Sequence, residues 1–499
     1  MKHLLAAMVF MAAMEVWAAD DSKAEYKPVP GDYPMSKWAK EVSPENALPE
    51  YPRPMMVRKD WMNLNGKELG THRGGYDAFS FDITGALNEK GENELVVAVW
   101  DPTASDHYPR GKQTNRPGGI FYIPCTGIWQ TAWLEPVSET SISGLKMIPD
   151  IDRGKLELTV AVRGGDPAAK VRAEVFDGEK KVAEATGTPG KPIKLPIPNA
   201  KLWWPDDPFL YGLKVALDGS KDAVESYFGM RKSSLGKDDK GITRMMLNNK
   251  FIVQNGVLDQ GYWPGGNLTA PTDAALRYDI EAIKQLGFNM SRKHIKVEPQ
   301  RWYYWCDKLG LLVWQDMPSI SPGSKEHHRD QFMAELEQMI DERFNHPSIV
   351  SWIPFNEGWG LGGFDLKDVT AKVIAMDGTR LANHESGAGG MPHQGANRFD
   401  AGVGHIVDFH CYHSLNAPKP EPNRAAVIGE YGYAKYLGAC KKYAPFVHDP
   451  GVSGFVWTQI TDVERERNGL MTYDRGKFNE DPEKVAAENE KWYKDFMKH

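Results

Sequence analysis

Two apolar stretches of the sequence each end on a glutamate. Residues 348–355 are mostly apolar and stop at Asn356 and Glu357, and residues 425–429 stop at Glu430. A continuous apolar run of this length is typical of a strand buried on both faces of a parallel sheet. Barrels and open α/β sheets place their chemistry at the carboxyl ends of such strands. Two carboxylates that meet there can serve as acid/base and nucleophile in retaining glycoside hydrolysis, whereas solvated loop glutamates would have no such role.

The second half of the chain alternates between strand-like and helical patterns. In residues 329–344 apolar side chains recur at helical spacing, and Asn345-His-Pro347 then ends the helix just before an apolar run. This alternation predicts a C-terminal (β/α)8 TIM barrel, a fold of about 250 residues. Its eight strands are expected at residues 250–259, 288–294, 310–316, 349–357, 380–385, 406–412, 425–430 and 453–458.

Short β patterns dominate the first half of the chain. Alternating or fully apolar stretches predict strands at residues 76–82, 94–100 and 127–134. Further stretches at 155–162 and 171–176 are separated by Gly and Asp turns, which predicts a small β-sandwich. The length of 499 residues also indicates two or three domains.

The composition limits the partners of this protein. A formal net charge of −7 and the lack of any basic tract argue against nucleic acid. Residues 1–19 have a basic start, an apolar core and small residues, which is typical of a secretory signal peptide, so we expect a periplasmic or secreted protein. No later segment reaches the roughly 18 apolar residues of a membrane span. The four cysteines form no metal-binding spacing and are expected to be mostly buried thiols, with a disulfide and the oligomeric state left open.

Three strings in the second half resemble glycoside hydrolase family 2, which contains β-galactosidases and β-glucuronidases. They are Trp352-Ile-Pro-Phe-Asn-Glu-Gly-Trp359, Gly429-Glu-Tyr431 and Gly454-Phe-Val-Trp-Thr-Gln-Ile-Thr-Asp462. The N-terminal strings Asn65-Gly-Lys67, His72-Arg-Gly-Gly-Tyr76 and Gly127-Ile-Trp-Gln130 are similar to the sugar-binding jelly-roll domain of that family. Leu202-Trp-Trp-Pro-Asp-Asp-Pro-Phe-Leu-Tyr211 resembles the end of its immunoglobulin-like domain.

The resemblance implies a multidomain chain with three domains after the signal peptide. These are an N-terminal jelly-roll-like β domain at residues 20–137, an immunoglobulin-like β-sandwich at 138–236 and the catalytic TIM barrel at 237–499. Residues 61–67 read as an early family string joined directly to a later one. Several jelly-roll strands are therefore expected to be missing, which would leave the first domain incomplete.

The resemblance also implies roles for the residues at the strand ends. Glu357 matches the acid/base of the family, Glu430 its nucleophile, and Asn356 the asparagine that contacts the sugar 2-OH. Tyr412 matches a tyrosine that hydrogen-bonds the nucleophile. Trp457 resembles the tryptophan floor under the sugar ring, and plain packing is the alternative for this side chain.

Three further residues are predicted to bind the substrate. Arg292 and His294 match an element near the sugar, and the strand period places both on one face; a buried ion pair is the alternative for Arg292. His410 shares a face with Tyr412, while Cys411 points the other way, so this string does not read as a metal site. We expect no metal and no cofactor.

These residues predict a retaining exo-β-glycosidase that acts on a carbohydrate, most simply a β-galactosidase. The family alternatives are a β-glucuronidase and a β-mannosidase, and an inactive carbohydrate-binding protein is the alternative from another class. Glucuronidases of the family read the sugar acid with an Asn-x-Lys element after the last strand, which Asn468-Gly-Leu470 does not supply. Arg475 or Lys477 could take its place.

The assignment predicts a definite geometry. Retaining enzymes hold the two carboxyl groups at roughly 5–5.5 Å, whereas inverting enzymes leave roughly 6.5–9.5 Å for a water. We expect Glu357 and Glu430 at the shorter separation, with Asn356, Tyr412 and Trp457 in the same pocket. The negative charge of Glu430 should raise the pKa of Glu357 and make it the acid.

Overall fold

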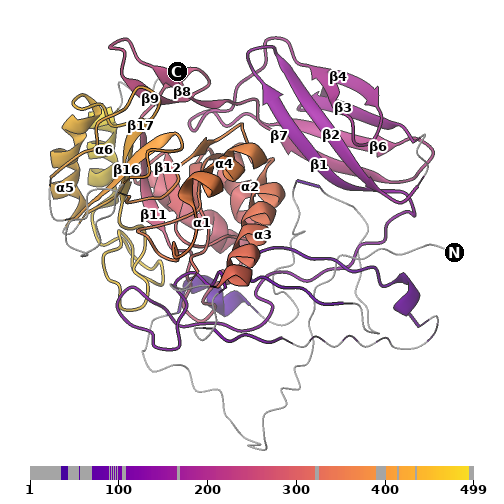
Figure 1. Cartoon of the computed structure of the whole chain (residues 1–499), viewed down its shortest axis with the longest axis horizontal. Coiled ribbons are helices and arrows are strands. Elements are labelled where there is room, and N and C mark those ends of the chain that lie inside the picture. The colour runs from indigo at the N-terminus through magenta and orange to yellow at the C-terminus, as the bar shows by residue number, and fades with distance from the viewer. Residues whose placement is uncertain are drawn as a thin grey trace, which may run out of the picture.

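The computed structural model comprises a β-sandwich, a barrel and an N-terminal segment that lies across the barrel (Figure 1). It describes residues 35–42, 55–56, 70–88, most of 90–103, 108–165, 169–320, 325–388, 400–412, 415–432 and 435–493. The expected signal peptide at 1–19 and the string at 61–67 lie outside the described residues.

Eight parallel strands form the barrel, in the order β15, β14, β13, β12, β11, β18, β17, β16. All eight predicted strands are confirmed. The outer neighbours β15 and β16 approach each other through a hydrogen bond from the His405 N–H to the Ala382 carbonyl of 2.8 Å. The strands are β11 (Gln254–Asp259), β12 (Met290–Lys293), β13 (Leu312–Asp316), β14 (Ile349–Ile353), β15 (Leu381–Ala382), β16 (Ile406–Cys411), β17 (Ala425–Tyr431) and β18 (Gly454–Trp457).

Helices cover the outside of this barrel (Figure 1). They are α1 (Asp273–Gln285), α2 (Gln300–Leu309), α3 (Glu326–Arg343), α4 (Leu366–Met376), α5 (Tyr436–Tyr443) and α6 (Pro482–Tyr493). Thr272 caps α1 by accepting a hydrogen bond from the Ala275 N–H. In the described part of the chain, none of the helices combines the length and the apolar character that crossing a bilayer requires. All four cysteines are free thiols, and only Cys125 is not fully buried.

The predicted sandwich is also present, as two antiparallel sheets ordered β1-β2-β5 and β4-β3-β6-β7. Alternate side chains of β2, namely Leu156, Leu158 and Val160, are fully buried between the sheets. The strands are β1 (Ser141–Asp150), β2 (Lys155–Arg163), β3 (Val171–Asp177), β4 (Lys180–Gly187), β5 (Ile193–Pro196), β6 (Tyr211–Leu217) and β7 (Ala223–Phe228).

A small antiparallel sheet closes the amino end of the barrel. It consists of β8 (Ser233–Lys237), β9 (Thr243–Leu247) and β10 (Lys250–Phe251). Met245 and Leu247 pack into the same buried cluster as Trp314 in the barrel. The first barrel strand was expected to begin at residue 250, but residues 250–251 pair with β9 instead, because the chain turns back before it enters the barrel.

The N-terminal segment differs from the predicted jelly-roll. In the described part of residues 70–137 the chain forms isolated bridges, such as Gln113 with Tyr122. The strands predicted at 76–82 and 127–134 are absent from these described residues. A strand needs a partner that satisfies its backbone groups. Here the backbone instead bonds to barrel loops, for example through the Ile123 N–H to Glu464 at 2.9 Å. Only part of the predicted strand at 94–100 is described.

Asp307 on α2 joins the sandwich to the barrel. One of its oxygens accepts a hydrogen bond from the Tyr227 hydroxyl on β7 (2.8 Å) and lies 2.6 Å from the His346 ring. The other oxygen accepts from the Ser348 N–H just before β14 (2.9 Å). A buried carboxylate with this many donors leaves all of them without a partner when it is removed.

We therefore expect Asp307→Ala to destabilise the protein by about 3 kcal/mol, because it leaves buried donors of both domains without an acceptor. The measurement is the thermal midpoint, which should fall by roughly 5 °C. The matched control is Asp239→Ala, since Asp239 is exposed. Equal midpoints for the two variants would show that Asp307 does not hold this joint.

Candidate active site

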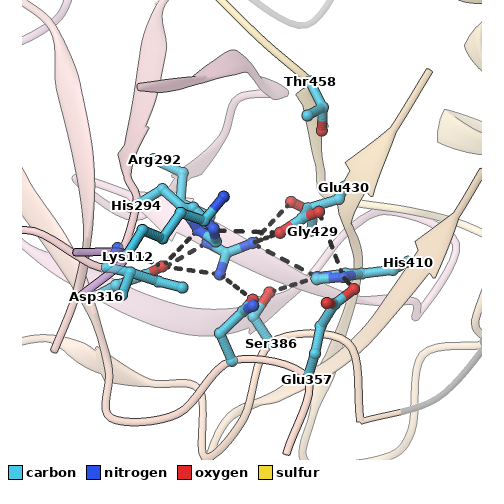
Figure 2. Close-up of polar contacts among 12 residues, drawn as sticks. Lys112, Arg292, His294, Asp316, Glu357, Ser386, His410, Gly429, Glu430 and Thr458 are labelled. Atoms are coloured by element: carbon cyan, nitrogen blue, oxygen red, sulfur yellow. Dashed lines mark hydrogen bonds and ion pairs between the residues drawn. The ribbon is translucent and has the colours of Figure 1, made fainter. Parts of the chain in front are cut away.

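The two glutamates meet at the carboxyl end of the barrel. One oxygen of Glu357, one of Glu430 and a ring nitrogen of His410 all lie within 4.8 Å of one another. Figure 2 shows the two carboxylates on either side of the His410 ring. One oxygen of each carboxylate thus approaches the other more closely than the roughly 6.5–9.5 Å between the carboxyl groups of inverting enzymes, which favours the predicted shorter separation.

Arg292 on β12 forms hydrogen bonds to three other residues of the site. Its guanidinium is fully buried and makes two hydrogen bonds to Asp316 (3.0 and 2.8 Å). It also donates to Glu430 Oε1 at 3.0 Å and to Asn356 Oδ1 at 2.7 Å. Burial lowers the pKa of Arg292, but the charges of Asp316 and Glu430 outweigh it and raise the pKa overall. Arg292 therefore forms the buried ion pair that was the alternative for it, and it also contacts the predicted nucleophile; its role in binding the substrate stays a prediction.

Glu430 is held from two sides. Arg292 donates to Oε1, and the Tyr412 hydroxyl donates a very short hydrogen bond to Oε2. Thr458, at the end of β18, lies 2.9 Å from the same hydroxyl. Burial and the nearby charges of Glu430 and Glu357 raise the pKa of Tyr412 well above its ordinary value, so the hydroxyl keeps its proton. The predicted contact between Tyr412 and the nucleophile is present.

His410 lies between the two carboxylates and is fully buried. Its Nδ1 is 2.7 Å from Glu357 Oε1 and 3.6 Å from Glu430 Oε2, and its Nε2 is 2.9 Å from the Ser386 hydroxyl. Ser386 donates its one proton to Asp408 at 2.7 Å, so it accepts from Nε2. This arrangement places Nδ1 to donate to Glu357 and Nε2 to donate to Ser386, as the charged form of the ring would. Burial lowers the pKa of His410, but Glu430 and Glu357 raise it above its ordinary value.

The expectation for the pKa of Glu357 was wrong. Burial raises this pKa, but the hydrogen bond from His410 and the charges of His410, Lys112 and Arg292 lower it below its ordinary value. The backbone of Glu357 is left-handed (φ 49°), a conformation that costs a non-glycine residue about 1 kcal/mol. Its N–H donates to the Ser386 carbonyl at 2.9 Å, which fixes that turn. In the free protein the proton of this pair therefore resides mainly on His410, 2.7 Å from Glu357.

His294 lies at the edge of the site and contacts Asp316 more closely than Glu430. Its Nδ1 lies 3.0 Å from Asp316 Oδ2 and 3.9 Å from Glu430 Oε1. Burial and the charges of Lys112 and Arg292 lower the pKa of His294 well below its ordinary value, so the ring is neutral. Burial also raises the pKa of Asp316 to about 6, against the opposing charge of Arg292. At neutral pH Asp316 is still mostly ionised.

Trp457 does not line the site with the other predicted residues. It is 1% exposed and packs in the apolar layer between sheet and helices, 5.4 Å from the Tyr431 ring and 5.2 Å from the Tyr436 ring. Successive strand residues face opposite sides, so Thr458, not Trp457, turns toward Tyr412. These contacts favour the packing alternative for Trp457, and a contact of this ring with the sugar stays an untested prediction.

Several residues of this cluster were missed from the sequence. Asp316 ends a predicted strand just as Glu430 does, so the same rule would have found it. Ser386 and Asp408 carry no such signal, because their role depends on a contact with His410 or with each other. Lys112 carries none either, since it comes from the N-terminal segment.

The spacing of Glu357, His410 and Glu430 is short enough for three ligands of one metal ion. A metal ligand must offer a lone pair, whereas Glu430 and Glu357 raise the pKa of His410 and so favour its protonated form. A metal ion would first have to displace the proton that His410 donates to Glu357. The donor set therefore fits proton exchange between His410 and Glu357.

The fold and the site together define a barrel protein with paired carboxylates at the strand ends. The chain matches the family described as Glycosyl hydrolases family 2 over residues 140–231, and its TIM barrel domain over residues 240–486. The chain belongs to this family. Both matched regions lie after residue 139, so neither includes the N-terminal segment.

Curated relatives carry two kinds of name. A putative β-glucuronidase from Formosa agariphila is 30% identical over 62% of this chain and 38% of its own. A β-glucuronidase from Bacteroides fragilis is 25% identical over 83% of this chain and 64% of its own length. A β-galactosidase from Thermoanaerobacter pseudethanolicus is 26% identical over 58% of this chain and 39% of its own length. The chain spans less than two thirds of each of these relatives.

Solved structures show the same fold. A Bacteroides uniformis β-glucuronidase matches with a TM-score of 0.65 and 20% identity, over 86% of this chain and 59% of that one. A β-galacturonidase from Eisenbergiella tayi bound to galacturonate matches with a TM-score of 0.64 and 19% identity, over 86% and 84%. The likeness extends over most of this chain.

The shared proton can be observed directly. We expect His410 to titrate above its ordinary value of 6.5, since Glu430 and Glu357 stabilise its charged form. In Glu357→Gln the titration should move to lower pH, because the neutral amide no longer stabilises the imidazolium. The measurement is an NMR titration of ring-labelled histidine, assigned with His410→Asn. Exposed Glu337→Gln on α3 is the control, and identical His410 curves in both glutamine variants would refute the pairing.

Proposed function

We propose that this protein is a retaining exo-β-glycosidase. The observation that carries the proposal is the approach of Glu357 and Glu430 to within 4.8 Å at the mouth of the barrel. At this separation one carboxylate can attack the anomeric carbon while the other protonates the leaving oxygen. Membership of the glycosyl hydrolase family and the names of the relatives support the same chemistry.

In the first step Glu430 attacks the sugar. Arg292 and Tyr412 each donate to one of its oxygens, so the attacking lone pair is positioned without rotation of the side chain. The Asn356 Oδ1 accepts from Arg292, which leaves its Nδ2 group to donate to a sugar hydroxyl. His410 passes its proton to Glu357 across the 2.7 Å contact between Nδ1 and Oε1, and Glu357 delivers that proton to the leaving oxygen and is left ionised.

In the second step a water molecule resolves the glycosyl enzyme. Glu357, now ionised, accepts a proton from this water and the bond between Glu430 and the sugar breaks. The two inversions give overall retention. Both β-galactosides and β-glucuronides are candidate substrates, since relatives carry both names, and the β-galactoside predicted from the sequence stays a prediction.

Substitution of the two glutamates tests the roles. Glu430→Gln should reduce turnover at least about 1,000-fold on every β-glycoside that the protein cleaves, because no nucleophile is left. Glu357→Ala should reduce it least for activated aryl glycosides, whose leaving groups need no acid. Exposed Glu337→Gln serves as the control. Wild-type turnover by Glu430→Gln would remove the nucleophile assignment.

The stereochemistry is a separate test. An NMR time course on a cleaved aryl β-glycoside should show the β-anomer of the sugar as the first product, before mutarotation. The panel of substrates should include the β-galactoside, β-glucuronide and β-mannoside. The α-anomer as first product would show inversion, and sugar binding without any cleavage would favour an inactive carbohydrate-binding protein.

A further inference from the structure

The N-terminal segment places one lysine at the edge of the active site. The N–H groups of Arg110 and Gly111 donate to the carbonyl of Ser319, just after β13 (3.2 and 3.3 Å). Gly111 has φ 66°, and a Cβ atom there would lie 2.7 Å from the Ile295 carbonyl oxygen, just after β12. The backbone is therefore pressed onto two barrel loops. The next residue, Lys112, is fixed by this contact.

The Lys112 side chain is largely buried, and its ammonium makes no hydrogen bond to an acceptor among the described residues. The side chain is 5% exposed, and its nitrogen lies 5.6 Å from the Tyr122 ring centre and 5.8 Å from that of Trp359. Glu466 Oε2 is 3.9 Å away, beyond hydrogen-bond distance, and this oxygen already accepts from the Tyr122 hydroxyl. Glu466 therefore offers this ammonium an ion pair without a hydrogen bond, and its donors are free for an acceptor oxygen supplied by a ligand.

This ammonium acts on the candidate active site. Figure 2 shows Lys112 beside Asp316 and His294, on the opposite side of Arg292 from His410. Beyond the effect of burial, its charge contributes to lowering the pKa of His294 and of Glu357. Lys112 thus lies on the side of the candidate site that Asp316 and His294 form.

Three other cations that could bind an acid group of the substrate are less suited than Lys112. Arg475, one of the two substitutes suggested by the sequence, is 3% exposed, makes two hydrogen bonds to Asp279 (3.2 and 2.9 Å) and stacks 3.7 Å from the Trp263 ring centre. Lys477 is exposed. The three nearest hydrogen-bonding partners of Arg292 are Asp316, Asn356 and Glu430. Of these four cations, Lys112 is the buried one with donors to spare.

We propose that Lys112 binds a carboxylate on the sugar ring of the substrate and so makes the protein select β-uronides over neutral β-hexosides. The inference rests on the proposed glycosidase function. A charge-assisted hydrogen bond from an ammonium to a carboxylate is stronger than one to a hydroxyl. A buried donor that loses its designed acceptor also discriminates strongly against the analogue that lacks it. The charge would come from the N-terminal segment rather than from the loop after the last barrel strand.

The test compares aryl β-glucuronide, β-galacturonide, β-galactoside and β-glucoside in the purified full chain. In Lys112→Met we expect kcat/KM to fall about 100-fold for the better uronide and by less than about 5-fold for the neutral glycosides. Lys112→Arg should restore part of the uronide activity. Lys477→Met is the matched control, because Lys477 is exposed, and it should leave kcat/KM for uronides and for neutral glycosides unchanged. An unchanged ratio of uronide to neutral activity would overturn the proposal.

A second variant works in the opposite direction. Glu466→Gln removes the negative charge 3.9 Å from the Lys112 ammonium while it can still accept from Tyr122. We expect a lower KM for uronides and an unchanged KM for neutral glycosides. A variant that merely disturbed the fold would affect both kinds of substrate, which a matching fall in the thermal midpoint would reveal.

Binding separates this inference from the glycosidase proposal. Calorimetric titration of the wild type with glucuronate, galacturonate and glucose needs no turnover. Uronate binding that Lys112→Met abolishes would support the lysine site even if no glycoside were cleaved. Cleavage of neutral glycosides without any uronate binding would overturn the lysine site and leave the glycosidase proposal intact.

Discussion

The buried guanidinium of Arg292 is the interaction on which the site depends. It bonds at once to Asp316 on β13, to Asn356 after β14 and to Glu430 on β17. A cation without water can be tolerated only when anions and acceptors surround it, so the ends of these strands are held together. The ion network therefore does two things, since it stabilises the barrel end and it orients the predicted nucleophile.

His410 and its partners complete this arrangement. A chain of hydrogen bonds runs from Asp408 through Ser386 and His410 to Glu357. Ser386 donates to Asp408, and the His410 ring lies between Ser386 and Glu357 with one nitrogen next to each. The low pKa of Glu357 in the free protein is thus a consequence of where its proton is stored. Entry of a leaving-group oxygen would change the balance between the two groups.

The N-terminal segment contributes to the same site, and its described residues between 70 and 137 form isolated bridges in place of the predicted strands. Residues that would belong to a jelly-roll use their backbone groups on barrel loops, as Gly111 does on Ser319 and Ile123 on Glu464. The aromatic residues of the segment also pack on the barrel, for instance Tyr122 against Tyr262 with ring centres 4.7 Å apart. A piece of chain far from the barrel in sequence thus forms part of the wall of its mouth.

The sequence by itself determined the barrel, the sandwich and the two glutamates. Continuous apolar runs that stop at Glu357 and Glu430 are local signals, and a strand buried on both faces must look this way. The rule that side chains alternate along a strand likewise placed His410 and Tyr412 on one face. The same rule, applied past the end of β18, would have turned Trp457 away from the site. The resemblance to a family with a tryptophan there pointed the other way.

Only the tertiary structure decided which groups share protons and charges. The pKa of Glu357 depends on whether a cation or an anion lies nearer, and His410 at 2.7 Å outweighs the effect of Glu430. Ser386, Asp408 and Lys112 carry no pattern in the sequence that marks them, because their significance lies in contacts between distant segments. The sequence also could not predict whether residues 70–137 form strands. A β propensity reports how a segment fits a pleated surface and not whether a partner strand exists. Local sequence patterns therefore determine the helices and strands, whereas the distances between side chains at the barrel mouth determine which groups exchange protons.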